Sequence, residues 1–400
     1  MAILLIAQNG AAQYMWQIKK DTVVKWYYYD GDEFNGPNVD EEKWIPAYSW
    51  TKVNYDFDYL MTPERIEFRN GIAHFMCYRD TGLYEVPVWQ CDSAFKKKYA
   101  ASLVNGNKFK YLFSAGNVWS RKQYGKGYFE LRFKTTDSYG MWPAFWLYGS
   151  NKDEIDLMEL KGEKKDEVHI DIHCLHGCDH GYMGGGIFPR SYGGWIKVSG
   201  FLADDYNILS GEWQDGYVKY YLNGVGIGYF KGEFGSKQMN LIIGTGPAKD
   251  GKGFDPGCNA TSVFPNSYDI DYARVWYKTP VSKDQVAGHK HTTFSYTPFP
   301  EKTKAFLKKK IGFMYSKKAF KNDDITVSVL PEGNKKILVT TVGRNIDYKI
   351  TFSDMNGHEL STQNIKNTFA EFDFSGSAAE KVRMKLKTAF RSVEEIITLN

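Results

Sequence analysis

The chain has 400 residues, more than one compact core usually holds, so we expect one large domain and one smaller domain. Its 51 basic and 47 acidic residues give a formal net charge of only +4, and no segment carries a long basic run, which argues against nucleic-acid and membrane partners. Aromatic residues make up 16% of the chain, more than a core needs, and the excess suits clefts that stack on ligands such as sugars and bases.

Residues 1–21 are expected to form a separate N-terminal segment. MAILLIAQNGAAQ has a short apolar run and no basic flank, so it is too short to span a membrane and incomplete as a signal peptide, although it fits the remnant of a trimmed export signal. No other stretch approaches the roughly eighteen apolar residues of a spanning helix, and we expect no membrane span. The 5 cysteines are few and odd in number, which argues against a disulfide framework.

Residues 22–280 are predicted to form an all-β domain. Short runs rich in Tyr, Phe, Val and Trp are separated by Gly, Asn and Asp, as in VVKWYYYD, GYFELRFKTT, EVHIDIHC and YDIDYARVWY. This spacing favours a β-sandwich or a barrel. Asn223-Gly224 lies between YVKYYL and VGIGYF and predicts a β-hairpin.

Two further segments follow this domain. Residues 281–321 carry Pro, Lys and polar residues in a weak pattern, which indicates a linker or a segment that wraps the main domain. Residues 322–400 alternate strands with Gly and Asn turns and predict a smaller immunoglobulin-like β-domain. Its stretch YKITFSDMNGHEL somewhat resembles the sorting tails of bacterial surface secretion, and a carbohydrate-binding or spacer module is equally consistent.

The stretch DEIDLMEL, residues 153–160, places acidic groups among large apolar ones. In a regular strand Glu154 and Asp156 share one face, while Glu159 points to the other. One extra residue at Leu157-Met158, a β-bulge, would turn Glu159 to the face of the first two acids. We therefore predict either a solvated acidic strand or a bulged strand that gathers three carboxyl groups.

Gathered carboxyl groups would have a specific chemistry. Close like charges raise the pKa of at least one carboxyl group and leave a protonated acid beside an ionised base. Two carboxyl groups about 5 Å apart across a glycosidic bond are the arrangement for hydrolysis with retention, one as nucleophile and one as acid/base. A divalent-ion loop is the alternative, but the run lacks the Asp/Asn-Gly spacing of an EF-hand.

The residues before this stretch favour a sugar ligand. Trp142 and Trp146 lie four residues apart and share one face in a strand. Aromatic faces beside carboxylates are suited to hold pyranose rings, although either Trp alone is as well explained as a core residue.

These motifs together resemble glycoside hydrolase family 16, the retaining endo-β-glycanases of jelly-roll fold. The similar segments, which span about residues 22–278, are DEFNG (32–36), YGKGYFELRFK (124–134), WPAFW (142–146), EIDLME (154–159) and YDIDYARVWY (268–277). The resemblance implies that Glu154 is the nucleophile, Asp156 its assisting carboxylate and Glu159 the acid/base.

The resemblance also implies further site residues. EVHIDIHC places His169 and His173 on one face, and His173 matches a histidine that faces the catalytic residues in the family. Many relatives have an Arg near the position where this chain has Trp119, so substrate choice there is open. Asp271 and Gly71 match side-chain and backbone ligands of a structural calcium ion that family members often bind.

The segment HCLHGCDHG, residues 173–181, combines His and Cys. Zinc binding, a local Cys174–Cys178 bridge and a loop with free side chains remain open, and the spacing fits no standard zinc pattern.

We therefore expect a monomeric bacterial protein that is secreted, periplasmic or on the cell surface, with a polysaccharide substrate and no required cofactor. Its substrate is expected to be a β-1,3 or mixed-linkage glucan, or a β-galactan of the agar, porphyran, carrageenan or mucin type. A non-catalytic carbohydrate-binding protein on the same fold is the alternative from another functional class.

Overall fold

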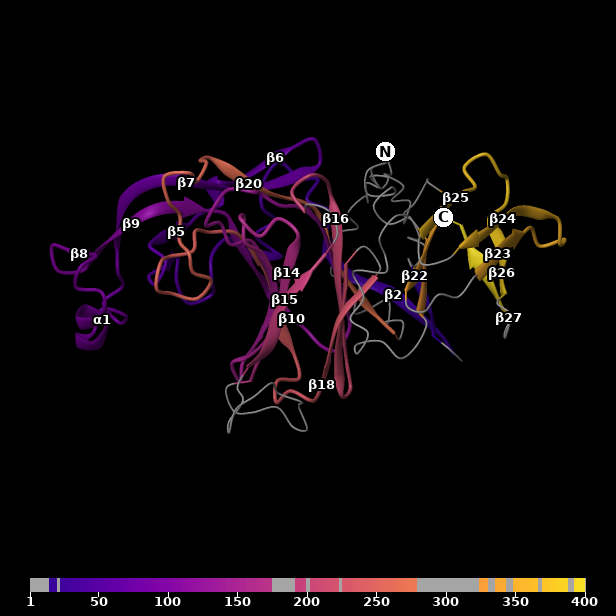
Figure 1. Ribbon diagram of the computed structural model, residues 1–400, viewed down its shortest axis with the longest axis horizontal. Coiled ribbons are helices and arrows are strands. Elements are labelled where there is room, and N and C mark those ends of the chain that lie inside the picture. Colours follow the sequence, from indigo (N-terminus) through magenta and orange to yellow (C-terminus); the bar gives the residue numbers. More distant parts are fainter. Residues whose placement is uncertain are drawn as a thin grey trace, which may run out of the picture.

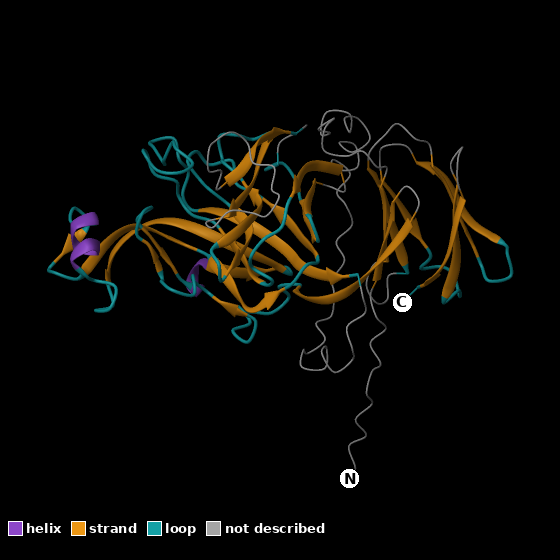
Figure 2. Ribbon diagram, turned by 90° about the horizontal axis from the view of Figure 1, so that it is seen from below, coloured by secondary structure: helices purple, strands orange, loops and turns teal. Residues whose placement is uncertain are grey.

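The computed structural model describes residues 14–19, 22–174, 191–198, 202–222, 225–278, 324–329, 335–342, 348–365, 369–387 and 392–399. These parts are almost entirely β-strand (Figure 2). The helices among them are short: the 3-10 helix η1 (Pro63–Arg65) and α1 (Ser93–Lys98). No helix within the described ranges is long and apolar enough to cross a membrane.

One sheet of seven strands carries the acidic stretch. Its order is β15 (Ser191–Lys197), β14 (Glu167–Cys174), β13 (Asp153–Glu159), β12 (Ala144–Gly149), β19 (Met239–Gly244), β10 (Asn117–Tyr124) and β3 (Trp44–Ile45). All neighbours are antiparallel. We call it the seven-stranded sheet.

A larger sheet faces it (Figure 1). Its main path is β18 (Val225–Lys231), β17 (Tyr217–Leu222), β16 (Asn207–Gln214), β11 (Tyr128–Lys134), β20 (Asn266–Tyr277) and β2 (Thr22–Asp32). The first half of β20 pairs with β7 (Ile72–Glu85), and its second half pairs with β2. The predicted hairpin is confirmed, since Leu222 pairs with Val225.

The core lies between these two sheets and follows from period-two alternation. In β12 and β14 every second side chain is buried, and these buried residues pack on those of β11, β16 and β17. The result is the predicted all-β sandwich, with Glu154, Asp156 and Glu159 of β13 on the face that points away from the core. Large members of the core include Phe129, Phe133, Phe145, Trp213 and Tyr220.

The N-terminal boundary differs from the expectation. Tyr14–Lys19 form a strand, β1, that pairs with β2 on one side and with β21 (Asp324–Val329) on the other. Residues 14–19 therefore belong to the sheet and not to a separate segment over 1–21. One of its two partners, β2, follows directly in the sequence, and the other, β21, lies far along the chain.

The C-terminal residues form a second β-sandwich (Figure 1). One layer continues from β1 through β21 and β22 (Lys336–Val342) to β25 (Phe369–Asp373). The other has the order β24 (Glu359–Ile365), β23 (Tyr348–Ser353), β26 (Lys381–Lys387) and β27 (Ser392–Thr398). Its own apolar core includes Ile350, Phe352 and Phe372. The predicted linker over 281–321 lies outside the described residues.

A long arm projects from the opposite end of the sandwich (Figure 1). It consists of the outer part of β7, helix α1, β8 (Leu103–Val104) and β9 (Lys108–Ala115), with β4 (Val53–Asn54) and β5 (Tyr59–Met61) beside it and β6 (Ile66–Arg69) at its base. A small separate core built on Val53, Val86, Cys91 and Phe109 stabilises the arm. The Asp92 side chain accepts a hydrogen bond from Phe95 N (2.7 Å) and begins α1.

A buried ion pair attaches the end of β2 to β20. Arg274 donates from Nε and Nη2 to the two carboxylate oxygens of Glu33, both at 2.8 Å. Breaking a buried pair leaves one charge without its partner, so Arg274→Met is expected to lower the free energy of unfolding by about 3–5 kcal/mol. Chemical denaturation measures this loss.

The double variant Glu33→Gln/Arg274→Met serves as the control. It removes both charges, so we expect it to lose less stability than the sum of the two single variants. Additive losses would contradict a direct energetic coupling between the two side chains.

Candidate active site

The predicted bulge in β13 is confirmed. On the β12 side, Asp156 lies opposite Trp146 and Met158 lies opposite Phe145, so Leu157 is one residue more than the partner strand supplies. The register against β14 shifts between Asp156 and Glu159 as well. The extra residue resets the alternation of side chains along the rest of the strand.

The bulge brings the three carboxyl groups to one face. Leu157 and Met158 are both fully buried in the core, so Glu159 follows Glu154 and Asp156 onto the outer face. Each acid faces a polar residue on β14. In the order of the acids, these partners are His173, Asp171 and His169.

Glu159 is held through both of its oxygens. Trp142 Nε1 donates to Oε1 at 3.0 Å, and His169 Nδ1 lies 3.0 Å from Oε2. The Glu159 side chain is only 9% exposed. Two partners at opposite oxygens fix its plane, which is what a group that transfers a proton to a defined atom requires.

Glu154 and Asp156 share a buried acidic environment. Burial raises the pKa of Glu154 to about 7, with repulsion from Glu159 and Asp171 adding to it and the nearby His173 opposing it. Burial, followed by repulsion from Glu154 and Glu159, raises the pKa of Asp156 well above its ordinary value. The hydrogen bond between these two groups lowers the pKa of Glu154 and raises that of Asp156, which assigns Asp156 as the donor.

His173 lies against the same acids. Its Nε2 is 3.2 Å from Asp156 Oδ2 and 3.5 Å from Asp171 Oδ2. Glu154, Asp156 and His173 are also the group among the described residues whose ligand atoms, within 4.8 Å of one another, could hold a metal ion. The same atoms are the candidate catalytic groups, so a metal bound there would block them.

Aromatic side chains beside Glu154 form what we call the first aromatic cluster. Tyr48 and Tyr148 both lie close enough to Glu154 for its charge to raise their pKa further, although burial is the main cause of that rise. Trp119 is only 4% exposed and packs against the other members of the cluster. Ring centroids of neighbouring members lie 5.0–6.3 Å apart. The members are Tyr48, Trp50, Trp119, Trp146 and Tyr148.

A second aromatic cluster lies beside Glu159. Trp142 stacks on Phe254 with ring centroids 4.6 Å apart and planes 8° from parallel. Phe254 also contacts His169 (5.0 Å) and Trp195 (5.4 Å). The buried Lys161 holds this loop, since its Nζ donates to the carbonyl oxygen of Phe254 at 2.6 Å. The carboxyl groups thus lie between two aromatic surfaces.

The sequence predicted only some of these aromatic groups. Trp142 and Trp146 do lie on the face of the acids, but each belongs to a different cluster. Trp50, Trp195 and Phe254 were not predicted. Trp50 and Phe254 come from irregular segments in which no periodic pattern marks a residue as part of the site, whereas Trp195 lies in β15 opposite His169.

The residues that match a calcium site do not fit one. The carboxylate of Asp271 forms an ion pair with Arg132, and both side chains are buried. A guanidinium at this carboxylate competes with any cation. Gly71, the backbone ligand implied by the resemblance, has the left-handed φ of 74° of a tight turn between β6 and β7.

Cys174 is disulfide-bonded, whereas Cys77, Cys91 and Cys258 are free. The rest of the HCLHGCDHG segment, including Cys178, lies outside the described residues. The zinc and bridge alternatives for Cys178 therefore stay predictions.

Two known proteins with similar sequences bear on the family of this chain. Kappa-carrageenase of Pseudoalteromonas carrageenovora is 27% identical over 189 residues, which cover 42% of this chain and 47% of the relative. Glucan endo-1,3-beta-glucosidase A1 of Niallia circulans is 26% identical over 210 residues, which cover 48% of this chain and 28% of the relative. The chain thus spans less than half the length of these relatives.

The fold is similar to that of a solved structure. The endo-beta-1,3-glucanase of Pyrococcus furiosus superposes with a TM-score of 0.50 at 19% identity, covering 65% of this chain and 97% of that one. The sequence profile of glycosyl hydrolases family 16 matches residues 56–274, which include every strand of the seven-stranded sheet except β3. Since this match covers more than half of the chain and contains the bulged strand with its three acids, the chain belongs to glycosyl hydrolases family 16.

Proposed function

We propose that the protein is an endo-β-glycanase that hydrolyses internal bonds of a polysaccharide with retention of configuration. One observation carries the proposal: the bulge in β13 places Glu154, Asp156 and Glu159 on one face, between two aromatic clusters. Aromatic faces on both sides of a carboxyl pair suit a chain of pyranose rings that passes over it.

In the first step Glu154 attacks the anomeric carbon while Glu159 protonates the leaving oxygen. The C–O bond to the leaving sugar breaks, and a covalent glycosyl-enzyme ester forms on Glu154. Asp156 contributes its proton as a hydrogen bond to Glu154, which keeps the nucleophile oriented without a second negative charge beside it. Trp142 and His169 hold Glu159 at the glycosidic oxygen.

In the second step Glu159, now a carboxylate, removes a proton from water. The water oxygen bonds to the anomeric carbon, the ester breaks, and Glu154 leaves as a carboxylate. Two displacements at the same carbon return the original anomer. Both steps use side chains of the chain itself, so the proposal includes no cofactor.

A β-1,3 or mixed-linkage glucan is the proposed substrate class. The relative from Niallia circulans is named for glucan cleavage. The lysines beside the second cluster and its loop are paired with carboxylates, Lys164 with Glu167 at 2.6 Å and Lys252 with Asp56 at 3.2 Å. Because these lysines are already paired with carboxylates, they attract a sulfate group only weakly, which favours an uncharged chain over a sulfated one.

A β-galactan is the second candidate, because the relative from Pseudoalteromonas carrageenovora is named a kappa-carrageenase. A polysaccharide is too large to enter an intact cell, so either substrate places the proposed activity outside the cytoplasm. The proposal therefore includes export, to the medium, the periplasm or the cell surface.

A polysaccharide panel tests the activity. We expect new reducing ends from laminarin or mixed-linkage glucan with the intact protein, and a loss of at least about a thousandfold in Glu154→Gln, because an amide cannot form the glycosyl ester. Circular dichroism of the variant should match that of the parent protein. Binding without cleavage across glucans and galactans would identify a non-catalytic carbohydrate-binding protein instead.

Two further variants separate the roles of the acids. Glu167→Gln is the matched control, since Glu167 also lies on the seven-stranded sheet but pairs with Lys164, and full activity is expected. Glu159→Gln is expected to lose about 10²–10⁴-fold on polysaccharide. It should lose far less in the first step on an aryl glycoside with an acidic phenol, which leaves without protonation. Equal losses on both substrates would contradict the acid/base role.

Product stereochemistry provides an independent test. Proton NMR during the first minutes of cleavage should show the β anomer before mutarotation, because two displacements occur at one carbon. An initial α anomer would mean a single displacement by water and would contradict the nucleophile assignment.

The pH profile follows from the pKa of Glu154. The nucleophile must be ionised, and its pKa is about 7, so kcat/KM is expected to fall as the pH drops through about 7. The electrostatic interaction with His173 lowers this pKa of Glu154, so His173→Asn is expected to move the acid limb to higher pH. His74→Asn serves as the control, since His74 pairs with Asp269 on the other sheet. An unchanged limb in the His173 variant would exclude the coupling.

A further inference from the structure

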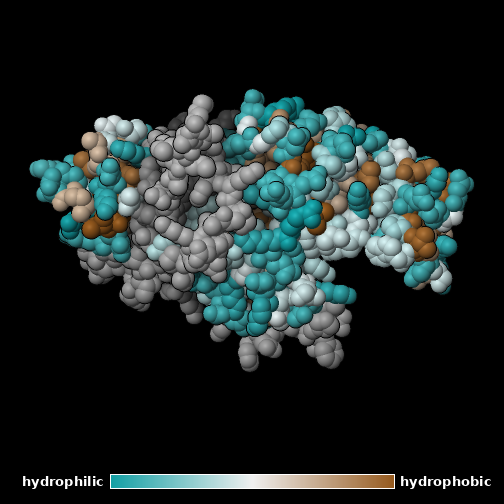
Figure 3. All heavy atoms as spheres, turned by 180° about the vertical axis from the view of Figure 1, so that it is seen from behind, coloured by the Kyte–Doolittle hydropathy of each residue, from teal (hydrophilic) through white to brown (hydrophobic). Residues whose placement is uncertain are grey.

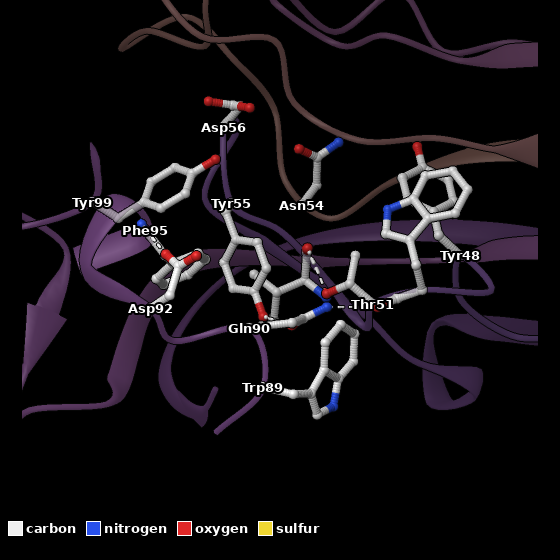
Figure 4. Close-up of a pocket in the computed structure, with 12 residues that line it drawn as sticks. Tyr48, Thr51, Asn54, Tyr55, Asp56, Trp89, Gln90, Asp92, Phe95 and Tyr99 are labelled. Carbon is white, nitrogen blue, oxygen red and sulfur yellow. Dashed lines mark hydrogen bonds between the residues drawn. The ribbon is translucent and has the colours of Figure 1, made fainter. Parts of the chain in front are cut away.

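The arm carries a pocket that lies next to the first aromatic cluster (Figure 4). Its volume is about 530 Å³, which is the size of a pocket for a small ligand. One wall comes from the segment around β4, and the other comes from the loop between β7 and α1. Neither wall contributes a residue to the acidic group on β13.

Two exposed indoles line this pocket. Trp89 is 72% exposed and Trp50 is 44% exposed, although most tryptophans of the chain are buried or half-buried. The end of the molecule that carries the arm also shows apolar patches on a largely hydrophilic surface (Figure 3), and Val88 beside Trp89 is 88% exposed. An exposed flat ring that lines a pocket offers a stacking surface for a ligand.

The pocket is continuous with the proposed active site. Trp50 lines the pocket and also contacts Trp119 (5.0 Å) and Tyr148 (5.6 Å) in the first aromatic cluster. Tyr48 is likewise shared, and it lies within the electrostatic reach of Glu154. A glycan bound across the carboxyl groups and the first cluster therefore reaches the pocket with its next units.

Side-chain hydrogen bonds hold the two walls together. Gln90 Nε2 donates to the carbonyl oxygen of Trp50 at 2.7 Å, and the Tyr55 hydroxyl donates to Gln90 Oε1 at 3.0 Å. Gln90 directly follows Trp89 in the chain. The loop that presents Trp89 is thus fixed before any ligand binds, which lowers the entropic cost of binding.

The charged groups of the lining are both carboxylates, Asp56 and Asp92. Asp56 pairs with Lys98 (3.0 Å) and Lys252 (3.2 Å), and Asp92 caps α1. No cation lines the pocket among the residues of the described chain that form it. The cations next to the lining are paired with Asp56 and attract a sulfate ester only weakly, whereas the hydroxyl groups of a neutral sugar can donate to the carboxylate oxygens.

We propose that this pocket is a distal subsite that binds an uncharged sugar unit of the same glycan chain by stacking on Trp89 and Trp50. The assignment rests on the proposed function, because it extends the substrate path from the acids on β13. With this subsite, the arm favours binding of glycan chains that are long enough to reach the pocket.

Binding in a variant that cannot turn over the substrate tests this proposal. Isothermal titration of Glu154→Gln with a trisaccharide and a hexasaccharide of β-1,3-linked glucose should show tighter binding of the hexasaccharide. Adding Trp89→Ala should weaken hexasaccharide binding by about tenfold and leave trisaccharide binding unchanged, since only the longer chain reaches the arm.

Two control variants accompany it. Trp89→Phe keeps an aromatic face and should retain most of the affinity for the hexasaccharide. Val88→Ala changes a neighbour that is even more exposed but does not line the pocket, and it should have no effect.

Equal affinities for the two oligosaccharides, no binding of either, or no effect of Trp89→Ala would overturn the subsite. Trp89-dependent binding of a sulfated carrageenan hexasaccharide would overturn the assignment to an uncharged unit. The reducing-end assay with Glu154 intact is a separate readout. Trp89-dependent binding without any turnover would remove the hydrolase proposal and leave the subsite, whereas turnover that is independent of Trp89 would do the reverse.

Discussion

The position of Leu157 is the constraint on which the candidate site depends. An unbulged strand would turn Glu159 into a core of fully buried apolar residues, where an unpaired carboxylate costs several kcal/mol. The extra residue instead sends Leu157 and Met158 inward. The opposite sheet accommodates this change, because a side-chain carbon at Gly211 on β16 would lie 2.1 Å from Leu157 Cδ2. The glycine in the large sheet thus leaves the space that the bulge in the other sheet fills.

Placing the three carboxyl groups close together costs free energy, and their neighbours offset this cost to different extents. Glu159 has a partner at each oxygen, Trp142 and His169. Burial, followed by repulsion from the neighbouring acids, raises the pKa values of Glu154 and Asp156. In the proposed two-step displacement Glu159 is positioned at the leaving atom, and Glu154 attacks once it has lost its proton.

The parts of this structure that follow from local patterns were predictable, and the parts that follow from distant contacts were not. Strands such as β11, β14 and β20 follow from alternation, and the bulge follows from the spacing of the acids on β13. Phe254 lies in a loop with a left-handed φ of 60°, and only its contact with Trp142 shows that it belongs to the site. Strand β1 was not predicted either, and one of its two partners, β21, lies far along the chain.

Polar residues at irregular strand positions have opposite roles in the two sheets. In the large sheet, β20 changes partner from β7 to β2, and its pairing with β11 is irregular at Arg132. The acids near this change are each matched by a guanidinium, Asp271 by Arg132 and Glu33 by Arg274. In the seven-stranded sheet the acids at the bulge have no such partner. A guanidinium at each of those acids would hold it in an ion pair, as Arg132 holds Asp271, and would leave no carboxyl group free for the proposed attack and proton transfer. The same kind of irregularity thus supports structure in the large sheet and the proposed chemistry in the seven-stranded sheet.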